Sequence, residues 1–185
     1  MSWGNAGDGG AAARGERGGR QRPPPSLKAR ALQLLSQREH SRAELERKLR
    51  WRPGVDDDET AAEHHAQLLA AVLDELQAKG YIHEERVADS VLHRRAAKWG
   101  ASRVRQELQA KGLSDEVVQE AVSSLRDTEL ERATEVWRKK FGQPATAPSE
   151  QARQMRFLAA RGFAAEVVRR VVQDAHRHAD DNSDT

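Results

Sequence analysis

Apolar residues recur along this chain at the three- and four-residue spacing of helices that bury one face. One such segment occurs twice, fifty positions apart. The matching residues are Leu108, Lys111, Gly112, Leu113, Glu116, Val117, Val118, Ala121 and Val122 in the first copy, and Leu158, Arg161, Gly162, Phe163, Glu166, Val167, Val168, Val171 and Val172 in the second. Each copy predicts a helix ended by a glycine, a short turn and a second helix. A repeated helix pair is typical of a stacked array that offers a long surface to a partner.

The full pattern predicts an all-α fold of nine helices in three tandem three-helix repeats, which form an elongated, curved array. No run of strict apolar and polar alternation predicts a strand. We expect the helical repeats at 26–82, 83–126 and 127–178, between a disordered Gly/Arg/Pro-rich tail at 1–25 and an acidic disordered C-terminus at 179–185. An arginine and glycine tail of this kind either extends passively or touches nucleic acid or acidic protein.

Polar residues mark the predicted helix starts. Ser26 is placed to cap the first helix, and two capping-box patterns, Ser41 with Glu44 and Thr128 with Glu131, precede the second and seventh. We place the remaining starts and ends at Glu84 to Trp99, Ser102 to Lys111, Ser114 to Leu125, Ser149 to Arg161 and Ala164 to about His178. In the third helix, which ends at Gly80, we expect the inward face to carry Leu68, Leu69, Val72, Leu73 and Leu76.

Composition narrows the class of protein. Aromatic residues make up 4% and charged residues 32% of the chain, so Leu, Val and Ala must build the core. The absence of cysteine excludes disulfides, thiolate zinc sites and thiol catalysis. No apolar run approaches the roughly 20 residues that a membrane span needs. We therefore expect a soluble, cytoplasmic protein.

The charges are arranged in blocks although the formal net charge is only +2. Residues 94–112 carry six Lys or Arg and one acid, residues 132–161 carry seven and two, and residues 55–85 carry nine acids and one Lys. Such blocks suit an elongated, charged partner, although most charge on helical proteins is solvated surface.

Catalytic patterns are lacking in the sequence. It contains no Ser/His/Asp group, no paired catalytic carboxylates and no nucleotide loop, so we predict no enzyme. The adjacent His64 and His65 would point about 100° apart on a helix, so we predict no metal there and no cofactor elsewhere. Trp51, Trp99 and Trp137 each lie near a basic residue, as base-stacking residues do, but helix-end packing is the preferred interpretation.

Five motifs follow one another through the centre of the chain: Leu73-Asp-Glu-Leu-Gln-Ala-Lys-Gly-Tyr-Ile82, Glu84-Glu-Arg-Val-Ala88, Arg94-Arg95, Lys98-Trp-Gly100 and Arg105-Gln-Glu-Leu-Gln-Ala-Lys-Gly-Leu113. In this order they resemble the RecX family of regulatory proteins, and the resemblance covers roughly residues 27–174. His83 stands where the family usually has Asp, and Val87 where it usually has an aromatic residue.

The resemblance implies three tandem three-helix repeats and a regulator that binds nucleoprotein filaments of the RecA recombinase. Such a regulator mostly inhibits the recombinase in recombination, DNA repair and the SOS response. We expect a monomer whose partner is the filament, with single- or double-stranded DNA as a further possible partner. The residues expected to contact the filament or DNA are Arg94, Arg95, Lys98, Arg103, Arg105, Lys111, Arg138, Lys139, Lys140, Arg153 and Arg156.

Two other functions remain open from the residues alone. One is a helical DNA-binding protein or transcription factor that acts on DNA directly, and the other is a scaffold with no connection to nucleic acid. A base-reading helix presents Asn, Gln and Arg. The helix at 114–125 carries Asp115, Glu116 and Glu120, which suits that role poorly.

Overall fold

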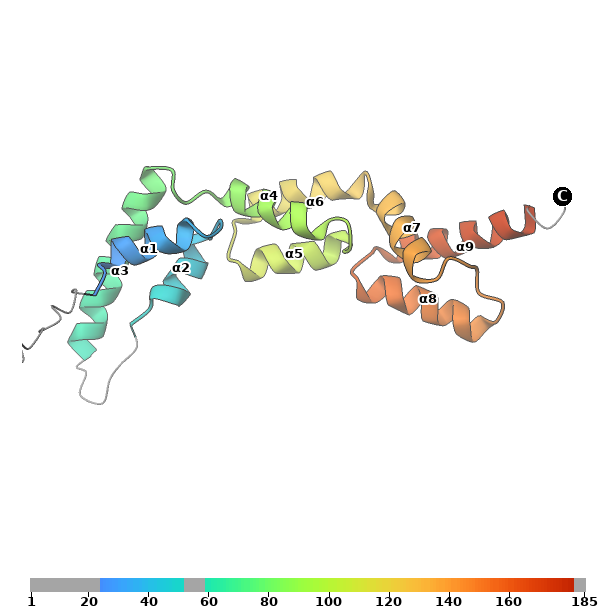
Figure 1. The fold of residues 1–185 in the computed structure, drawn as a ribbon, viewed down its shortest axis with the longest axis horizontal. Coiled ribbons are helices and arrows are strands. Elements are labelled where there is room, and N and C mark those ends of the chain that lie inside the picture. The colour runs from blue at the N-terminus through green and yellow to red at the C-terminus, as the bar shows by residue number, and fades with distance from the viewer. Residues whose placement is uncertain (1–23, 52–58, 182–185) are drawn as a thin grey trace, which may run out of the picture.

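The computed structural model describes residues 24–51 and 59–181, and within these ranges the regular structure is entirely helical. Its helices form an elongated, arched row (Figure 1). They are α1 (Leu27–Leu35), α2 (Arg42–Leu49), α3 (Glu59–Ala78), α4 (Glu84–Arg95), α5 (Ala101–Ala110), α6 (Asp115–Arg126), α7 (Glu129–Lys140), α8 (Pro148–Ala160) and α9 (Ala165–Asp181). We call α1–α3 repeat 1, α4–α6 repeat 2 and α7–α9 repeat 3.

Each repeat buries its own apolar cluster. Leu45, Leu73 and Leu76 are fully buried in repeat 1, and Val91, Val104 and Leu108 in repeat 2. Repeat 3 is centred on Ala133, Leu158, Phe163 and Val168. Because the three clusters are separate, polar and backbone contacts have a large part in fixing how one repeat sits on the next.

The predicted start signals hold for the first two helices. The Ser26 hydroxyl accepts a hydrogen bond from the amide of Ala29. Ser41 and Glu44 form the predicted capping box: the Ser41 hydroxyl accepts from the Glu44 amide at 3.1 Å, and the Glu44 carboxylate accepts from the Ser41 amide at 3.2 Å. These caps satisfy amides that an isolated helix leaves unpaired.

The second predicted capping box is wrong. Thr128 precedes α7, but its side chain makes no capping hydrogen bond, and its backbone has φ −106° and ψ 6°. The preceding helix ends only two residues earlier, at Arg126. The Thr128 hydroxyl instead donates to the Leu125 carbonyl at the end of that helix at 3.5 Å, and it accepts a hydrogen bond from Arg132 Nε of α7 at 3.2 Å.

Several predicted helix ends shift. Helix α4 ends at Arg95 rather than Trp99, α5 begins at Ala101 after Gly100, and α8 begins at Pro148. Helix α9 continues to Asp181, beyond the predicted end at about His178. The predicted tail lies outside the described residues apart from Pro24 and Pro25, as do the last four residues of the predicted acidic C-terminus.

Helix α3 also corrects one predicted core residue. Leu69, Leu73 and Leu76 are buried, but Leu68 is 47% exposed. Leu68 lies one position from Leu69, about 100° around the helix. An apolar stripe three to four residues apart therefore leaves Leu68 facing solvent.

The two junctions between repeats follow one plan. In each, the start of the second helix of one repeat contacts the turn between the second and third helices of the following repeat. The Ser41 hydroxyl donates to the Lys111 carbonyl at 2.5 Å, and the amides of Gly100 and Ser102 donate to the carbonyls of Arg161 and Gly162 at 2.9 and 3.2 Å. The segment that occurs twice in the sequence thus supplies the contact surface of both junctions.

A glycine is required at both turns. Gly112 and Gly162 have φ of +72° and +80°, which residues with a Cβ rarely adopt. A Cβ at Gly112 would lie 2.7 Å from the Cβ of Ala43, and one at Gly162 would lie 2.5 Å from the nitrogen of Arg103. Each glycine therefore ends a helix and admits the preceding repeat.

Candidate partner-binding groove

A groove of about 360 Å³ crosses the junction between repeats 2 and 3. One wall is formed by Ala97, Lys98 and Trp99, which come after the end of α4 in the chain. The opposite wall is formed by Val136, Lys139 and Lys140 of α7 together with Phe157 of α8 and Arg161 in the turn after it. We call this site the central groove. It brings four cations and two aromatic rings from two repeats together.

Two charged residues in the first turn of α7 hold the walls together. Arg132 donates to the carbonyls of Ala96 and Trp99 at 2.8 Å each, and to that of Leu125 at 2.7 Å. Glu129, only 5% exposed, accepts from the amide of Ala101 at 2.9 Å. The cation thus meets carbonyls at the ends of helices and the carboxylate meets the start of one, as the helix dipoles favour.

Arg132 is substantially withdrawn from water. Burial lowers the pKa of its guanidinium, and the nearby Glu129 carboxylate partly opposes that effect. Arginine keeps its charge even so. Arg132 bonds the carbonyls of Ala96 and Trp99 after α4, and it lies one turn before Val136 on α7. It therefore connects the two walls of the central groove.

Three arginines near the groove lie against aromatic rings. The guanidinium of Arg161 is 3.7 Å from the ring centre of Phe157, that of Arg103 is 5.2 Å from Trp99, and that of Arg153 is 5.8 Å from Phe141. Such contacts contribute about 0.5–1 kcal/mol at exposed sites. A guanidinium held in this way keeps its N–H donors available for an anion at its edge.

The structure separates the predicted contact residues into free and internally paired cations. Lys98, Lys139 and Lys140 line the central groove, Arg103 and Arg153 stack beside it, and Arg94 and Arg156 are exposed. Within the described residues, other groups engage the following: Arg95 pairs with Glu107 at 2.9 Å, Arg105 bonds Gln119 at 3.2 Å, Arg138 pairs with Glu135, Lys139 lies 3.8 Å from the same Glu135 carboxylate, and Arg94 donates to the Ser90 carbonyl at 2.9 Å.

Lys111 lies away from the exposed basic surface. Its ammonium is 2.7 Å from the Glu44 carboxylate, and the two side chains are 12% and 11% exposed. Burial raises the pKa of Glu44, but hydrogen bonds from Arg38, Lys111 and the Ser41 amide outweigh it and lower this pKa to about 2. The pair fastens repeat 1 to repeat 2.

Arg161 is a groove residue that the predicted set omits. Its signal was in the repeat itself, because Arg161 and Lys111 occupy the same position in the two copies. A basic residue before a helix-ending glycine is common for helix-dipole reasons alone, which hides a second role.

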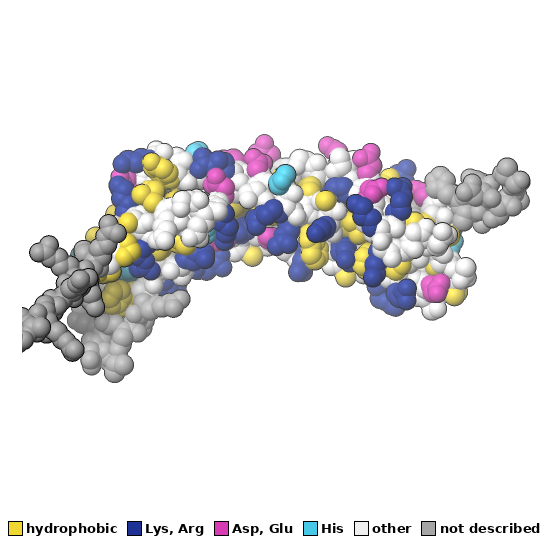
Figure 2. Space-filling view, viewed as in Figure 1, with side chains coloured by type: hydrophobic (Ala, Val, Ile, Leu, Met, Phe, Trp, Pro, Cys, Tyr) yellow, Lys and Arg dark blue, Asp and Glu magenta, His cyan; other side chains and the backbone are white. Residues whose placement is uncertain are grey.

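Charge is unevenly distributed over the surface. In the view of Figure 2, Lys and Arg gather across the middle and lower part of the molecule, over the junction between repeats 2 and 3 and over α8, whereas several Asp and Glu lie along its upper edge. Glu85, Asp89 and Glu120 border a hollow between α4 and α6. On the face in view, positive charge therefore predominates across the middle of the molecule.

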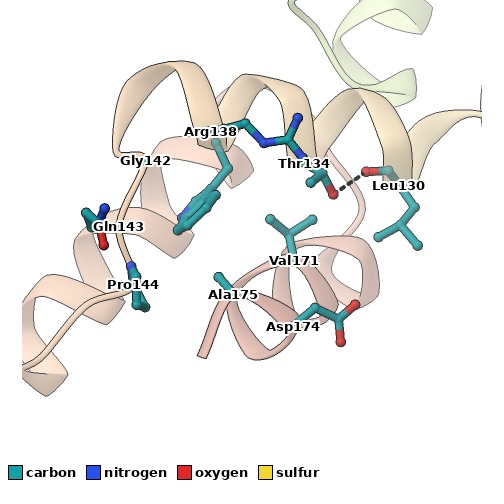
Figure 3. Close-up of a pocket in the computed structure, with 10 residues that line it drawn as sticks. Leu130, Thr134, Arg138, Gly142, Gln143, Pro144, Val171, Asp174 and Ala175 are labelled. Carbon is teal, nitrogen blue, oxygen red and sulfur yellow. Dashed lines mark hydrogen bonds between the residues drawn. The ribbon is translucent and has the colours of Figure 1, made fainter. Parts of the chain in front are cut away.

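A second hollow, of about 550 Å³, lies between α7, α9 and the loop after α7 (Figure 3). Leu130, Val171 and Ala175 form much of its lining, and the Thr134 hydroxyl donates to the Leu130 carbonyl at 2.9 Å. Its acid, Asp174, pairs with Arg170 and Arg177 on its own helix. This hollow brings no nucleophile and base together.

The histidines weighed as metal ligands have separate environments. His65 hydrogen-bonds the Leu49 carbonyl at 2.9 Å and lies against the ring of Trp51, while His64 is exposed. The acids at 56–58 lie outside the described residues. Over the described part of the chain, no three His, Asp or Glu side chains are grouped as metal ligands would be.

No helix within the described ranges is long and apolar enough to cross a membrane.

Comparison with known families decides the relationship. Models of the first, second and third three-helix domains of RecX match residues 28–61, 84–122 and 127–172. The chain belongs to the RecX family. Regulatory protein RecX of Leptothrix cholodnii is 50% identical over 163 residues, covering 88% of this chain and 98% of the relative. Regulatory protein RecX of Ralstonia nicotianae is 43% identical, with 88% and 96% covered.

Solved RecX structures share the fold. A crystal structure of regulatory protein RecX matches 78% of this chain and 70% of its own, with a TM-score of 0.61 at 20% identity. RecX from Lactobacillus salivarius matches 81% and 94%, with a TM-score of 0.60 at 19% identity. The row of three-helix repeats is therefore the RecX architecture.

Proposed function

We propose that this chain is a non-enzymatic, cytoplasmic regulator that binds nucleoprotein filaments of the RecA recombinase. It mostly inhibits the activity of the recombinase in recombination, DNA repair and the SOS response. The observation that carries the proposal is the central groove in a chain of the RecX family. Lys98 and Lys140 have no carboxylate partner within the described residues, and the hydrogen bond from Arg132 to the Trp99 carbonyl links the two walls that carry them. An extended array with such a groove suits an elongated, negatively charged partner.

Charge reversal in the groove tests this proposal. The double variant Lys98→Glu/Lys140→Glu should bind a RecA filament on single-stranded DNA at least about tenfold more weakly than the wild type, and with a smaller salt dependence. The control is Arg126→Glu/Arg169→Glu, which changes the same charge at exposed residues on α6 and α9. Equal losses in both double variants would refute a specific role for the groove.

Action as a transcription factor finds less support. Helix α6, the third helix of the central repeat, exposes Asp115, Glu116 and Glu120 rather than base-reading side chains. Binding to bare duplex DNA with clear sequence preference, and without any effect on recombinase filaments, would favour this alternative.

A further inference from the structure

The two junctions between repeats share their backbone plan but differ in charge. Ser41 and Gly100 are the N-cap residues of α2 and α5, and the residues four positions after these caps, Leu45 and Val104, are both buried in the core. By this alignment, position 103 in repeat 2 is equivalent to position 44 in repeat 1. Glu44 therefore has an arginine, Arg103, as its counterpart.

The residues that face these positions are also equivalent. Lys111 and Arg161 each precede the glycine that the neighbouring repeat contacts. In the junction between repeats 1 and 2 the result is an ion pair, Glu44 with Lys111, at 2.7 Å. In the junction between repeats 2 and 3 the same arrangement places two cations, Arg103 and Arg161, where a carboxylate and a cation would pair.

Neither arginine is neutralised within the described part of the chain. Each lies against an aromatic ring instead, Arg103 on Trp99 and Arg161 on Phe157, and both rings line the central groove. Like charges at a junction repel each other, and a bound anion removes that cost. The stacked guanidiniums need little rearrangement to bind it, because their side chains are already held.

We propose that the junction between repeats 2 and 3 is an oxyanion site in which Arg103 and Arg161 hold a phosphate of a nucleic-acid strand, in the role that the Glu44 carboxylate has in the junction between repeats 1 and 2. The site deepens the proposed function, on which it rests: it specifies which chemical group of the nucleoprotein filament this chain binds.

The surrounding cations favour a nucleic-acid strand over a single acidic side chain. Lys98 continues the positive charge along one wall of the groove, and Lys139 and Lys140 along the other. A ligand with successive negative charges can contact all of them. Because the guanidiniums already cover a face of Trp99 and of Phe157, the strand is held through its phosphates, and its sequence is not read.

Binding has a structural consequence. A phosphate between Arg103 and Arg161 bridges repeats 2 and 3, as the Glu44–Lys111 pair bridges repeats 1 and 2. The occupied junction should therefore resist opening more than the empty one, since a ligand that binds only the folded junction stabilises it. The phosphate thus supplies the negative charge that Glu44 supplies in the junction between repeats 1 and 2.

The variant Arg103→Glu tests the site because it restores the acid found in repeat 1. The introduced carboxylate can pair with Arg161 and lies in the first turn of α5, where a helix favours negative charge. The variant should melt no lower than the wild type but should bind a fluorescent oligothymidylate at least about tenfold more weakly, the usual result of losing a charge-assisted hydrogen bond. The control Arg126→Glu changes the same charge at an exposed residue of α6 that is not part of the groove lining.

Each outcome decides between specific alternatives. Equal losses in Arg103→Glu and Arg126→Glu would overturn the site, as would an unchanged affinity in Arg103→Glu. If inorganic phosphate alone raises the melting temperature of the wild type and not of Arg103→Glu, while oligothymidylate does not bind, the site takes free phosphate and not a strand. Binding of polyglutamate in place of oligothymidylate would overturn the phosphate assignment.

The experiment also separates this site from the proposed function, because it contains no recombinase. Oligonucleotide binding that depends on Arg103, in a chain without effect on RecA filaments, would retain the site and reject the function. Filament inhibition that Arg103→Glu leaves unchanged would reject the site and retain the function.

Discussion

Replacing Gly162 by alanine should loosen the junction between repeats 2 and 3. The new Cβ would lie 2.5 Å from the nitrogen and 2.7 Å from the Cβ of Arg103. Backbone atoms cannot swing aside, so α5 must retreat by about 1 Å to reach ordinary contact distances. That movement breaks the hydrogen bonds that the Gly100 and Ser102 amides donate across the junction.

The matched control is Gly142→Ala. Gly142 also follows the last residues of a helix and also has a positive φ, of +69°, but the nearest atom to its added Cβ is the Arg138 carbonyl oxygen at an ordinary 3.5 Å. Both variants adopt a left-handed backbone at a cost of about 1–2 kcal/mol. Gly162→Ala additionally loses two hydrogen bonds, each about 1 kcal/mol, so the variants should differ by about 2 kcal/mol.

Urea denaturation followed by circular dichroism measures the two losses of unfolding free energy. Hydrogen exchange at the Gly100 and Ser102 amides adds a local measurement, because these amides are protected by the junction alone. Their exchange should accelerate in Gly162→Ala and stay unchanged in Gly142→Ala. Equal losses of stability, with the two amides protected in both variants, would refute the junction geometry described above.

Two further substitutions test individual contacts. The pKa of Glu44 is about 2 in the fold against an ordinary 4.5, so its contribution to stability is complete above about pH 4.5 and disappears as the pH falls toward 2. The unfolding free energy of Glu44→Gln should therefore be lower than that of the wild type at neutral pH, and it should fall less steeply than that of the wild type between pH 4.5 and 2. Parallel pH profiles of the two proteins would contradict the pairing. His83 precedes α4, but its side chain makes no capping hydrogen bond. His83→Asp should therefore raise the unfolding free energy by about 1 kcal/mol, whereas His83→Ala should give no gain. Equal effects of the two substitutions would contradict the capping argument.

The architecture was predictable because each helix carries its own local signals. Ser26 and Ser41 mark starts by side-chain capping, and Gly112 and Gly162 mark turns that need a left-handed backbone. The apolar spacing of α5 and α6 identifies the buried face without reference to any other repeat. These signals depend on a few neighbouring residues, so they can be read from the sequence alone.

The errors occur where a residue's environment comes from another segment. Thr128 lies in the sequence pattern of a capping residue, but its hydroxyl bonds the Leu125 carbonyl of α6 and the Arg132 side chain of α7 instead. Leu68 belongs to an apolar pair of which only Leu69 finds a partner surface. A sequence pattern does not reveal which of two adjacent apolar positions will face another helix.

The basic surface shows the same division. The charge blocks contain Lys98, Lys139 and Lys140, which the structure places in the groove. They did not reveal that Glu44, 67 positions from Lys111, engages that lysine, or that Arg161 completes the groove. Such distinctions depend on which cations meet carboxylates across the junctions between repeats.

The most direct test of the proposed function is the rate of ATP hydrolysis by the RecA recombinase on single-stranded DNA, titrated with the wild type and with Lys98→Glu/Lys140→Glu. The wild type should inhibit hydrolysis at well below one molecule per recombinase, and the variant should need a much higher ratio. No inhibition at any ratio by a wild-type chain that circular dichroism shows to be helical would contradict its action as a filament regulator.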